Sequence, residues 1–90
     1  MELLKGRFVR SLSGRDKDLI LVVVGVTDEG LLILADGKTR KLEAPKKKKQ
    51  KHLALLSIPP LEEQTIGMLT NRKLKAAVKN AETLLATRKE

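Results

Sequence analysis

Residues 19–26 read Leu-Ile-Leu-Val-Val-Val-Gly-Val and form the longest apolar stretch of the chain. β-Branched residues are frequent in it, which favours a β-strand. Because no polar residue interrupts the stretch, we expect this strand to cross the centre of the fold. Gly25 predicts a bulge or a sharp bend within it. The stretch is too short for a membrane span, which needs roughly 18 apolar residues.

Shorter strand patterns lie on both sides of this stretch. Lys5–Ser13 precedes it, and Leu31–Ala35 follows it after a turn. Asp36-Gly37 predicts a type I′ hairpin turn, after which Lys38–Glu43 returns as a fourth strand. Leu53–Ile58 is expected to be a short fifth strand. Five short strands joined by tight turns within about 55 residues favour a small closed or nearly closed β-barrel.

The pattern changes at Pro59-Pro60, where the strand signals end. Leu61–Leu69 predicts a short helix that Gly67 weakens or ends. A longer helix is expected from an N-cap at Thr70 or Asn71 to about Arg88. The sequence thus predicts a mostly β protein with a C-terminal helix, comprising a barrel over residues 1–58 and a helical extension over residues 59–90.

An apolar stripe with helical spacing runs along the predicted long helix. It is formed by Leu74, Val78, Ala81 and Leu85. A helix of about 18 residues is marginal alone in water, so it should dock on another surface. The stripe either packs on the barrel, which we favour, or forms an interface for a partner.

The composition argues against an enzyme and against a metal or cofactor site. The chain has no Cys, Trp or Tyr, one Phe and one His, which excludes disulfides, thiol catalysis and cysteine-ligated metals. The acidic residues Asp16, Asp18, Asp28, Glu29 and Asp36 fall in predicted turns, where they are common for backbone reasons. No glycine loop of the Walker type is present. We therefore expect a binding protein without catalytic residues, metal or cofactor.

The net charge of +8, from 19 basic and 11 acidic residues, favours an anionic partner, nucleic acid first and a membrane surface second. Five of the lysines lie in residues 46–52, which hold no acidic residue. A run of this kind is either a solvated loop or a binding surface. Because Pro45 and the apolar residues from Leu53 bracket it, we expect it on the surface of the fold.

The turn predicted at residues 13–18 reads Ser-Gly-Arg-Asp-Lys-Asp and is a second candidate binding element. Arg15 has the geometry to bind phosphate or a base edge bidentately, and Lys17 supplies a point charge. In the alternative interpretation these residues form only a charged turn, paired with Asp16 or Asp18. With few aromatic residues, recognition should depend on phosphates and on nucleic-acid shape, not on base stacking.

The segments Gly-Arg-Phe-Val-Arg-Ser-Leu-Ser-Gly-Arg-Asp-Lys (6–17) and Ala-Asp-Gly-Lys-Thr-Arg-Lys-Leu-Glu-Ala-Pro-Lys-Lys-Lys-Lys-Gln-Lys-His-Leu (35–53) resemble small bacterial KOW-domain RNA-binding proteins. These are similar to KOW ribosomal proteins of the archaeal and eukaryotic large subunit. The resemblance covers about residues 4–54. It implies an SH3-like five-stranded barrel and cytoplasmic, ribosome-associated binding of ribosomal RNA in translation, with ribosomal proteins as further partners.

Carried over by position, the resemblance implies two groups of RNA-binding residues. The RNA-facing turn would contain Ser13, Gly14, Arg15 and Lys17. The basic surface beside it would contain Arg40, Lys41, Lys46, Lys47, Lys48, Lys49, Lys51 and His52. Asp18 departs from the pattern, since the group usually has glycine there, and its negative charge beside Lys17 makes the lysine run the firmer candidate.

A second hypothesis is a protein–protein interaction module of the transcription or translation machinery, which would use the barrel or the C-terminal helix. A membrane surface ranks lower, because no amphipathic aromatic anchor adjoins the basic run. The sequence predicts neither the oligomeric state nor the identity of the RNA.

Overall fold

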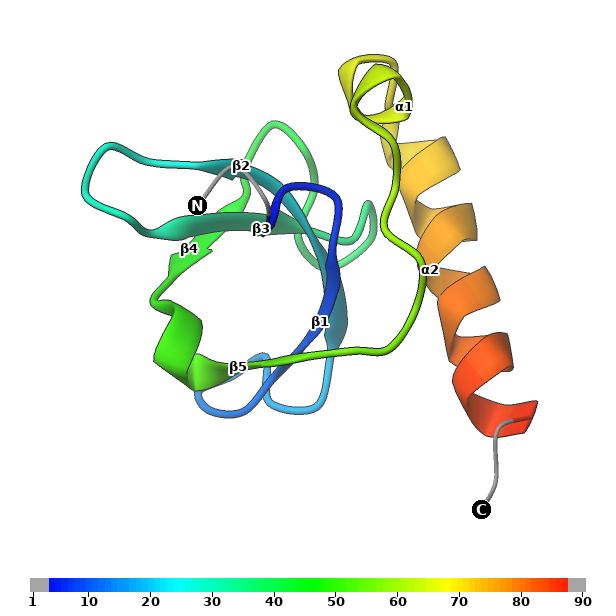
Figure 1. The fold of residues 1–90 in the computed structure, drawn as a ribbon, viewed down its shortest axis with the longest axis horizontal. Helices are drawn as coiled ribbons and strands as arrows, with labels where there is room; N and C mark the ends of the chain where they lie inside the picture. The colour runs from blue at the N-terminus through cyan, green and yellow to red at the C-terminus, as the bar shows by residue number, and fades with distance from the viewer. Residues whose placement is uncertain (1–3, 88–90) are drawn as a thin grey trace.

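The computed structural model describes residues 4–87 as a curved antiparallel sheet with a long helix beside it (Figure 1). The strands are β1 (Phe8–Ser11), β2 (Ile20–Val26), β3 (Leu32–Ala35), β4 (Lys46–Lys48) and β5 (Leu53–Leu55). The helices are the 3₁₀ turn η2 (Gln50–His52), the short α1 (Glu63–Gly67) and α2 (Asn71–Thr87). Since α2 alone has 17 residues and no strand exceeds seven, the protein is mixed α/β and not mostly β.

The apolar stretch at residues 19–26 forms the central strand, as predicted. The sheet order is β4-β3-β2-β1-β5. Alternate residues of β2 enter different cores. Ile20 and Val22 lie in a cluster that includes residues of α2. Leu21 and Val23 lie in a second cluster on the opposite face. Because both faces of this strand are buried, its sequence shows no polar alternation.

The bulge predicted at Gly25 is confirmed. Val22 and Val23 pair with Ala35 and Leu34, but Gly25 pairs with Ile33, so the register shifts between Val23 and Gly25. One extra residue on β2 bends the strand and increases its twist. The bend contributes to the curl of the sheet.

The fourth strand predicted over Lys38–Glu43 is wrong. The side chain of Asp36 accepts hydrogen bonds from the backbone amides of Lys38 (2.9 Å) and Arg40 (2.7 Å). This local turn occupies backbone amides that would otherwise donate to a neighbouring strand in a β-ladder. Gly37 has a φ of 79° but Asp36 does not have a positive φ, so the predicted type I′ turn is also absent.

Lysines 46–48 take the place of that strand. Lys46, Lys47 and Lys48 pair with Leu34, Ile33 and Leu32 of β3. An all-lysine segment has no alternation of polar and apolar residues and low strand propensity, so its sequence does not predict a strand. As β4 is an edge strand, its charges also discourage pairing with another chain.

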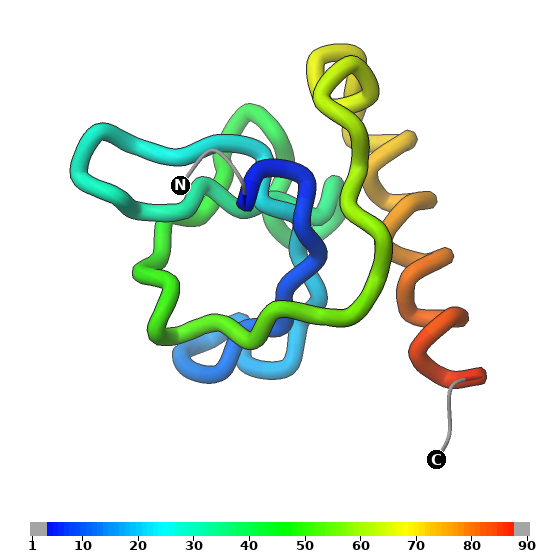
Figure 2. Tube along the Cα trace, viewed as in Figure 1, coloured from blue at the N-terminus to red at the C-terminus, as the bar shows by residue number. Residues whose placement is uncertain are grey.

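The sheet is curled, and its two edge strands, β4 and β5, are consecutive in the chain (Figure 2). β4 ends at Lys48, η2 follows, and β5 begins at Leu53 on the opposite edge. Within residues 4–87, no ladder joins β4 directly to β5. The observed element is thus a five-stranded antiparallel sheet whose edges are linked by η2.

Helix α2 packs on the outer face of the curled sheet. Three residues of its predicted stripe, Leu74, Val78 and Ala81, are buried with Phe8 and other sheet residues, and Leu85 is partly buried against the same cluster. Thr70 caps the helix, since its Oγ1 accepts from the Lys73 amide at 3.2 Å. Arg88, where the sequence predicts the helix end, lies outside the described residues.

The loop between β3 and β4 is fixed to the start of α2. The Leu42 amide donates to Asn71 Oδ1 at 2.8 Å, and Asn71 Nδ2 donates to Glu43 Oε1 at 2.8 Å. Gly37 lies so close that a side chain there would collide with the Asn71 carbonyl. A glycine with positive φ is therefore needed where the loop meets the helix.

Candidate nucleic-acid interface

The turn between β1 and β2 is closed by its own backbone. Lys17 N donates to Gly14 O at 3.2 Å, and Asp18 N donates to Ser11 O at 2.7 Å. Gly14 and Asp18 have φ values of 78° and 75°. Asp18, where the resembled group has glycine, thus occupies the left-handed region, which aspartate tolerates better than most residues. Arg15 and Lys17 project from this turn and are exposed.

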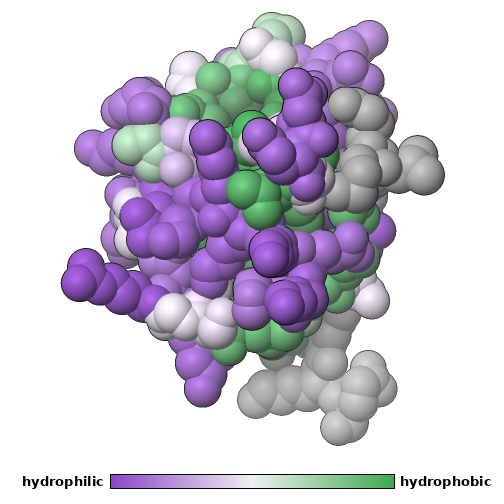
Figure 3. All heavy atoms as spheres, turned by 90° about the vertical axis from the view of Figure 1, so that its left-hand side faces the viewer, coloured by the Kyte–Doolittle hydropathy of each residue, from purple (hydrophilic) through white to green (hydrophobic). Residues whose placement is uncertain are grey.

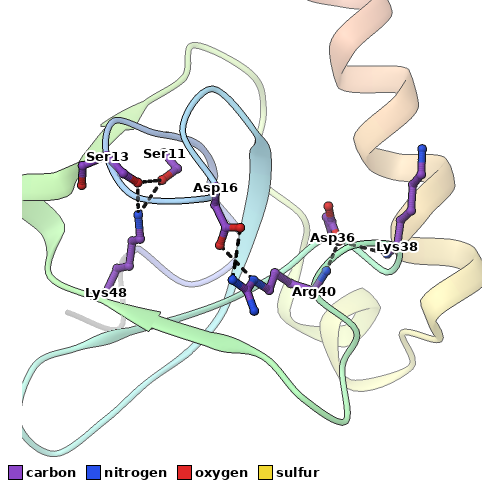
Figure 4. Close-up of polar contacts among 7 residues, drawn as sticks. All are labelled: Ser11, Ser13, Asp16, Asp36, Lys38, Arg40 and Lys48. Carbon is purple, nitrogen blue, oxygen red and sulfur yellow. Dashed lines mark hydrogen bonds and ion pairs between the residues drawn. The ribbon is translucent and has the colours of Figure 1, made fainter.

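Lys48 crosses from β4 to this turn (Figure 4). Its Nζ donates to Ser11 Oγ at 2.7 Å and to the Ser13 carbonyl at 2.6 Å. Ser11 is fully buried, and its hydroxyl donates in turn to Ser13 O at 3.1 Å. Lys48 therefore joins the edge strand β4 to the end of β1, across a gap that no backbone ladder spans.

A second contact brings the lysine run beside the same turn. The Leu12 amide donates to His52 O at 2.9 Å, which ties the start of the turn to η2. The Lys48 ammonium also lies 3.5 Å from where a side chain at Gly14 would begin. Two basic segments, joined by contacts between residues 35 or more positions apart, thus lie side by side.

Arg40 and Asp16 form a bidentate ion pair. Arg40 Nε lies 2.9 Å from Asp16 Oδ2, and Arg40 Nη2 lies 3.2 Å from Asp16 Oδ1 (Figure 4). The Asp16 side chain is 4% exposed and that of Arg40 28%. The hydrogen bond to Asp16 raises the pKa of Arg40, against a smaller opposing effect of burial. The pair connects the β1–β2 turn with the 36–40 loop, so Arg40 positions the turn.

Six other cationic side chains around the turn form no side-chain hydrogen bond or ion pair with residues 4–87. Arg15, Lys17, Lys47, Lys49 and Lys51 are all exposed, as is His52. We call these six residues the basic rim. In the face over β4 and η2, hydrophilic side chains dominate the surface (Figure 3). The rim is a cationic surface whose supporting turn and strand are held in place by Lys48 and Arg40.

Three further predicted residues lie at the margin of the rim. Ser13 is half-buried and its carbonyl is occupied by Lys48. Lys46 is half-buried in β4. Lys41 is exposed, but it precedes Leu42, whose amide is bonded to Asn71 at the start of α2. The structure therefore groups Lys41 with the helix side of the molecule.

The supporting roles of Lys48 and Arg40 are absent from the sequence expectations. The alternative interpretation of the turn pairs Arg15 and Lys17 with Asp16 or Asp18, whereas the partner of Asp16 is Arg40, 24 residues away. The spacing of residues within one segment does not predict a contact between two loops that are far apart in the sequence. Lys48 is one of four consecutive lysines, so nothing in the run distinguishes it from its neighbours until the strand register is known.

The described residues hold no group of three or more His, Cys, Asp or Glu side chains arranged to bind a metal ion. Across residues 4–87, helices fall short of the length and apolar character that a membrane crossing requires.

No model of a known protein family and no curated protein matches this sequence. The interpretation of the site therefore depends on its own residues and geometry.

Proposed function

We propose that this chain is a non-enzymatic RNA-binding protein that binds ribosomal RNA through the basic rim. The observation that carries the proposal is the contact of two basic segments, the Ser13–Lys17 turn and residues 46–52. Lys48 and the Leu12–His52 bond hold these segments together. Fixed cations release counterions from phosphates without first losing the entropy of a mobile loop.

The proposed fold class is an SH3-like barrel of the KOW type. Its support is the sheet order, the link from β4 through η2 to the opposite edge at β5, and the side-chain bridge of Lys48. The proposed setting is cytoplasmic and ribosome-associated, with ribosomal proteins as neighbours. This part of the proposal draws on the resemblance of residues 4–54 to KOW proteins.

The proposed function is tested by a salt titration of binding to structured ribosomal RNA fragments, with duplex DNA of matched length as competitor. We expect RNA to bind at least tenfold more tightly near physiological salt, a difference of about 1.4 kcal/mol. Equal binding of RNA and DNA, both lost with added salt, would show a merely cationic surface and would refute the proposal.

The role of the rim is tested with the double variant Lys49→Ala, Lys51→Ala. Its log–log salt slope should flatten by about 1.5 units, since each phosphate contact contributes about 0.7 for single strands and 0.9 for duplexes. The control is Arg72→Ala, Lys73→Ala, which removes two exposed charges from α2. An equal effect of the two variants would place the RNA away from the rim.

The stripe of α2 bears on the alternative of a protein-interaction module. Leu74, Val78 and Ala81 are buried against the sheet. A partner that bound this stripe would first have to separate α2 from the sheet, which would expose the hydrophobic core that they share. The structure therefore favours the form of the alternative in which a partner binds the barrel.

A further inference from the structure

A cleft that is open to solvent lies between α2 and the 36–40 loop. Its volume is about 330 Å³, and its floor contains Leu19, Ile20 and Val78. Its loop wall is held in place by two backbone bonds to Asp36 and by the contact of Gly37 with Asn71. The cleft is thus preformed, with an apolar floor and a rigid wall.

Three lysines surround the cleft, namely Lys38 from the loop and Lys75 and Lys79 from α2. All three are exposed. Within residues 4–87 the one ion pair is that of Arg40 and Asp16, so these three ammonium groups have no carboxylate partner within 4.0 Å. Like charges held together repel one another, and an anion bound between them relieves this repulsion.

The cleft also presents hydrogen-bond acceptors. Glu82 is exposed at its border, and Asp36 lies in its wall. Asp36 is only 6% exposed and its Oδ1 already accepts two backbone amides, whereas Glu82 is exposed, so Glu82 is the more accessible carboxylate for a ligand. A simple phosphate would be repelled by it, whereas a ligand with both an anionic group and N–H donors would satisfy both sides.

We infer that this cleft binds one unpaired nucleotide of the RNA, an inference that rests on the proposed function. The base lies on the aliphatic floor, its N–H groups face Glu82, and its phosphate lies between Lys75 and Lys79. A cleft of this volume is at the lower end of the range for small-ligand sites, so it accommodates one nucleotide. It would allow the protein to recognise unpaired RNA although the chain has no Tyr or Trp and a single Phe.

The test compares two charge-matched double variants on the same helix. Lys75→Glu, Lys79→Glu changes the cleft, and Arg72→Glu, Lys73→Glu makes the same change in net charge at exposed positions that do not line it. Each is titrated with an RNA hairpin that has an unpaired loop and with a fully paired RNA of the same stem. Circular dichroism verifies that both variants retain the helix.

We expect the cleft variant to bind the hairpin at least tenfold more weakly than the control variant does. For the fully paired RNA the two variants should be equal. Equal binding of the hairpin by both variants would overturn the inference and leave the proposed function intact. A failure of wild-type protein to prefer RNA over DNA would instead refute the proposed function.

A direct measurement uses guanosine monophosphate in an NMR titration of the wild-type chain, with inorganic phosphate as the comparison. The nucleotide should shift the amide signals of Ile20, Thr39 and Val78, and phosphate at equal concentration should not. Identical shifts for the two probes would show a site for phosphate alone and would overturn the inference. This readout does not depend on the affinity of the basic rim.

Discussion

At the scale of single residues, neighbouring lysines of one run lie in different environments. Lys48 is bonded to Ser11 and Ser13, whereas Lys47 and Lys49 are exposed and bonded to no side chain among residues 4–87. In a strand, successive side chains point to opposite faces. Lys48 pairs with the buried Leu32 and shares its face, and Lys47 pairs with Ile33 on the other face. The strand register therefore turns Lys48 toward its partners Ser11 and Ser13 and turns Lys47 toward solvent.

Lys48→Met should destabilise the fold by about 1–2 kcal/mol, because the apolar stem remains but two hydrogen bonds are lost. In a domain of this size, the corresponding decrease in Tm is on the order of 4–15 °C. The measurement is thermal unfolding followed by circular dichroism. Lys47→Met serves as the matched control and should change Tm little. Equal effects at the two positions would contradict the bridging role of Lys48.

Arg40→Lys should also act on stability before it acts on binding. Lysine keeps the charge but does not reproduce the two parallel bonds of the guanidinium to Asp16, and we expect a loss of about 1–2 kcal/mol. Chemical denaturation measures this loss, and RNA binding is then measured at a temperature where the variant is folded. A variant of unchanged stability that binds RNA more weakly would instead place Arg40 in direct contact with phosphate.

At the scale of secondary-structure elements, the loop at residues 36–44 connects the sheet with α2. Its own turn at Asp36 prevents a strand, and its end contacts the helix through Asn71. Glu43 lies beside the first residue of α2, where a negative charge also favours the helix dipole. The hydrogen bond from Asn71 and a backbone hydrogen bond lower the pKa of Glu43.

This lowered pKa predicts a pH-dependent contribution of Glu43. A carboxylate with a folded pKa below its unfolded value stabilises the fold above the unfolded pKa, about 4.3 for glutamate. The contribution is lost as the pH falls through the folded pKa. Glu43→Gln should therefore lower Tm slightly at pH 7, and this difference should shrink as the pH is lowered below about 4.3. Because Glu43 is exposed, the difference at pH 7 should shrink in high salt. A Tm difference that does not shrink as the medium is acidified would be contrary to this prediction.

At the scale of the whole molecule, the C-terminal helix and the sheet share one core. Leu74 is fully buried among residues from both parts. Residues 59–87 and the sheet should therefore unfold together, because the outer face of the sheet and the apolar face of α2 cover each other.

Leu74→Ala should cost about 3 kcal/mol, in line with other large-to-small changes in protein cores. Amide hydrogen exchange is the measurement, since it reports on each element separately. We expect protection to fall equally in α2 and β2, whereas the exposed-site control Lys73→Ala should leave both unchanged. Loss of protection confined to α2 would mean that the helix is an independent unit.

Much of this architecture could be predicted from the sequence, wherever a local pattern determines the result. The central strand at residues 19–26, the bulge at Gly25 and the cap at Thr70 follow from burial, backbone freedom and side-chain chemistry that act within a few residues. The same holds for the buried stripe of α2 and for the concentration of charge in residues 46–52. These features depend little on which distant residues contact them.

Only the tertiary structure decided which residues meet across the fold. The Asp36 side chain accepts the backbone amide of Arg40, so residues 38–43 do not form the expected fourth strand. Lysines 46–48 pair with β3 instead. The pairing of Asp16 with Arg40 and the bridge from Lys48 to Ser11 join residues 24 and 37 positions apart. Composition provides the charges, but register and loop packing determine which of them are bonded within the fold and which stay free for a ligand. The physical reason is that a long-range contact depends on the path of the whole chain between its partners, which no local pattern contains.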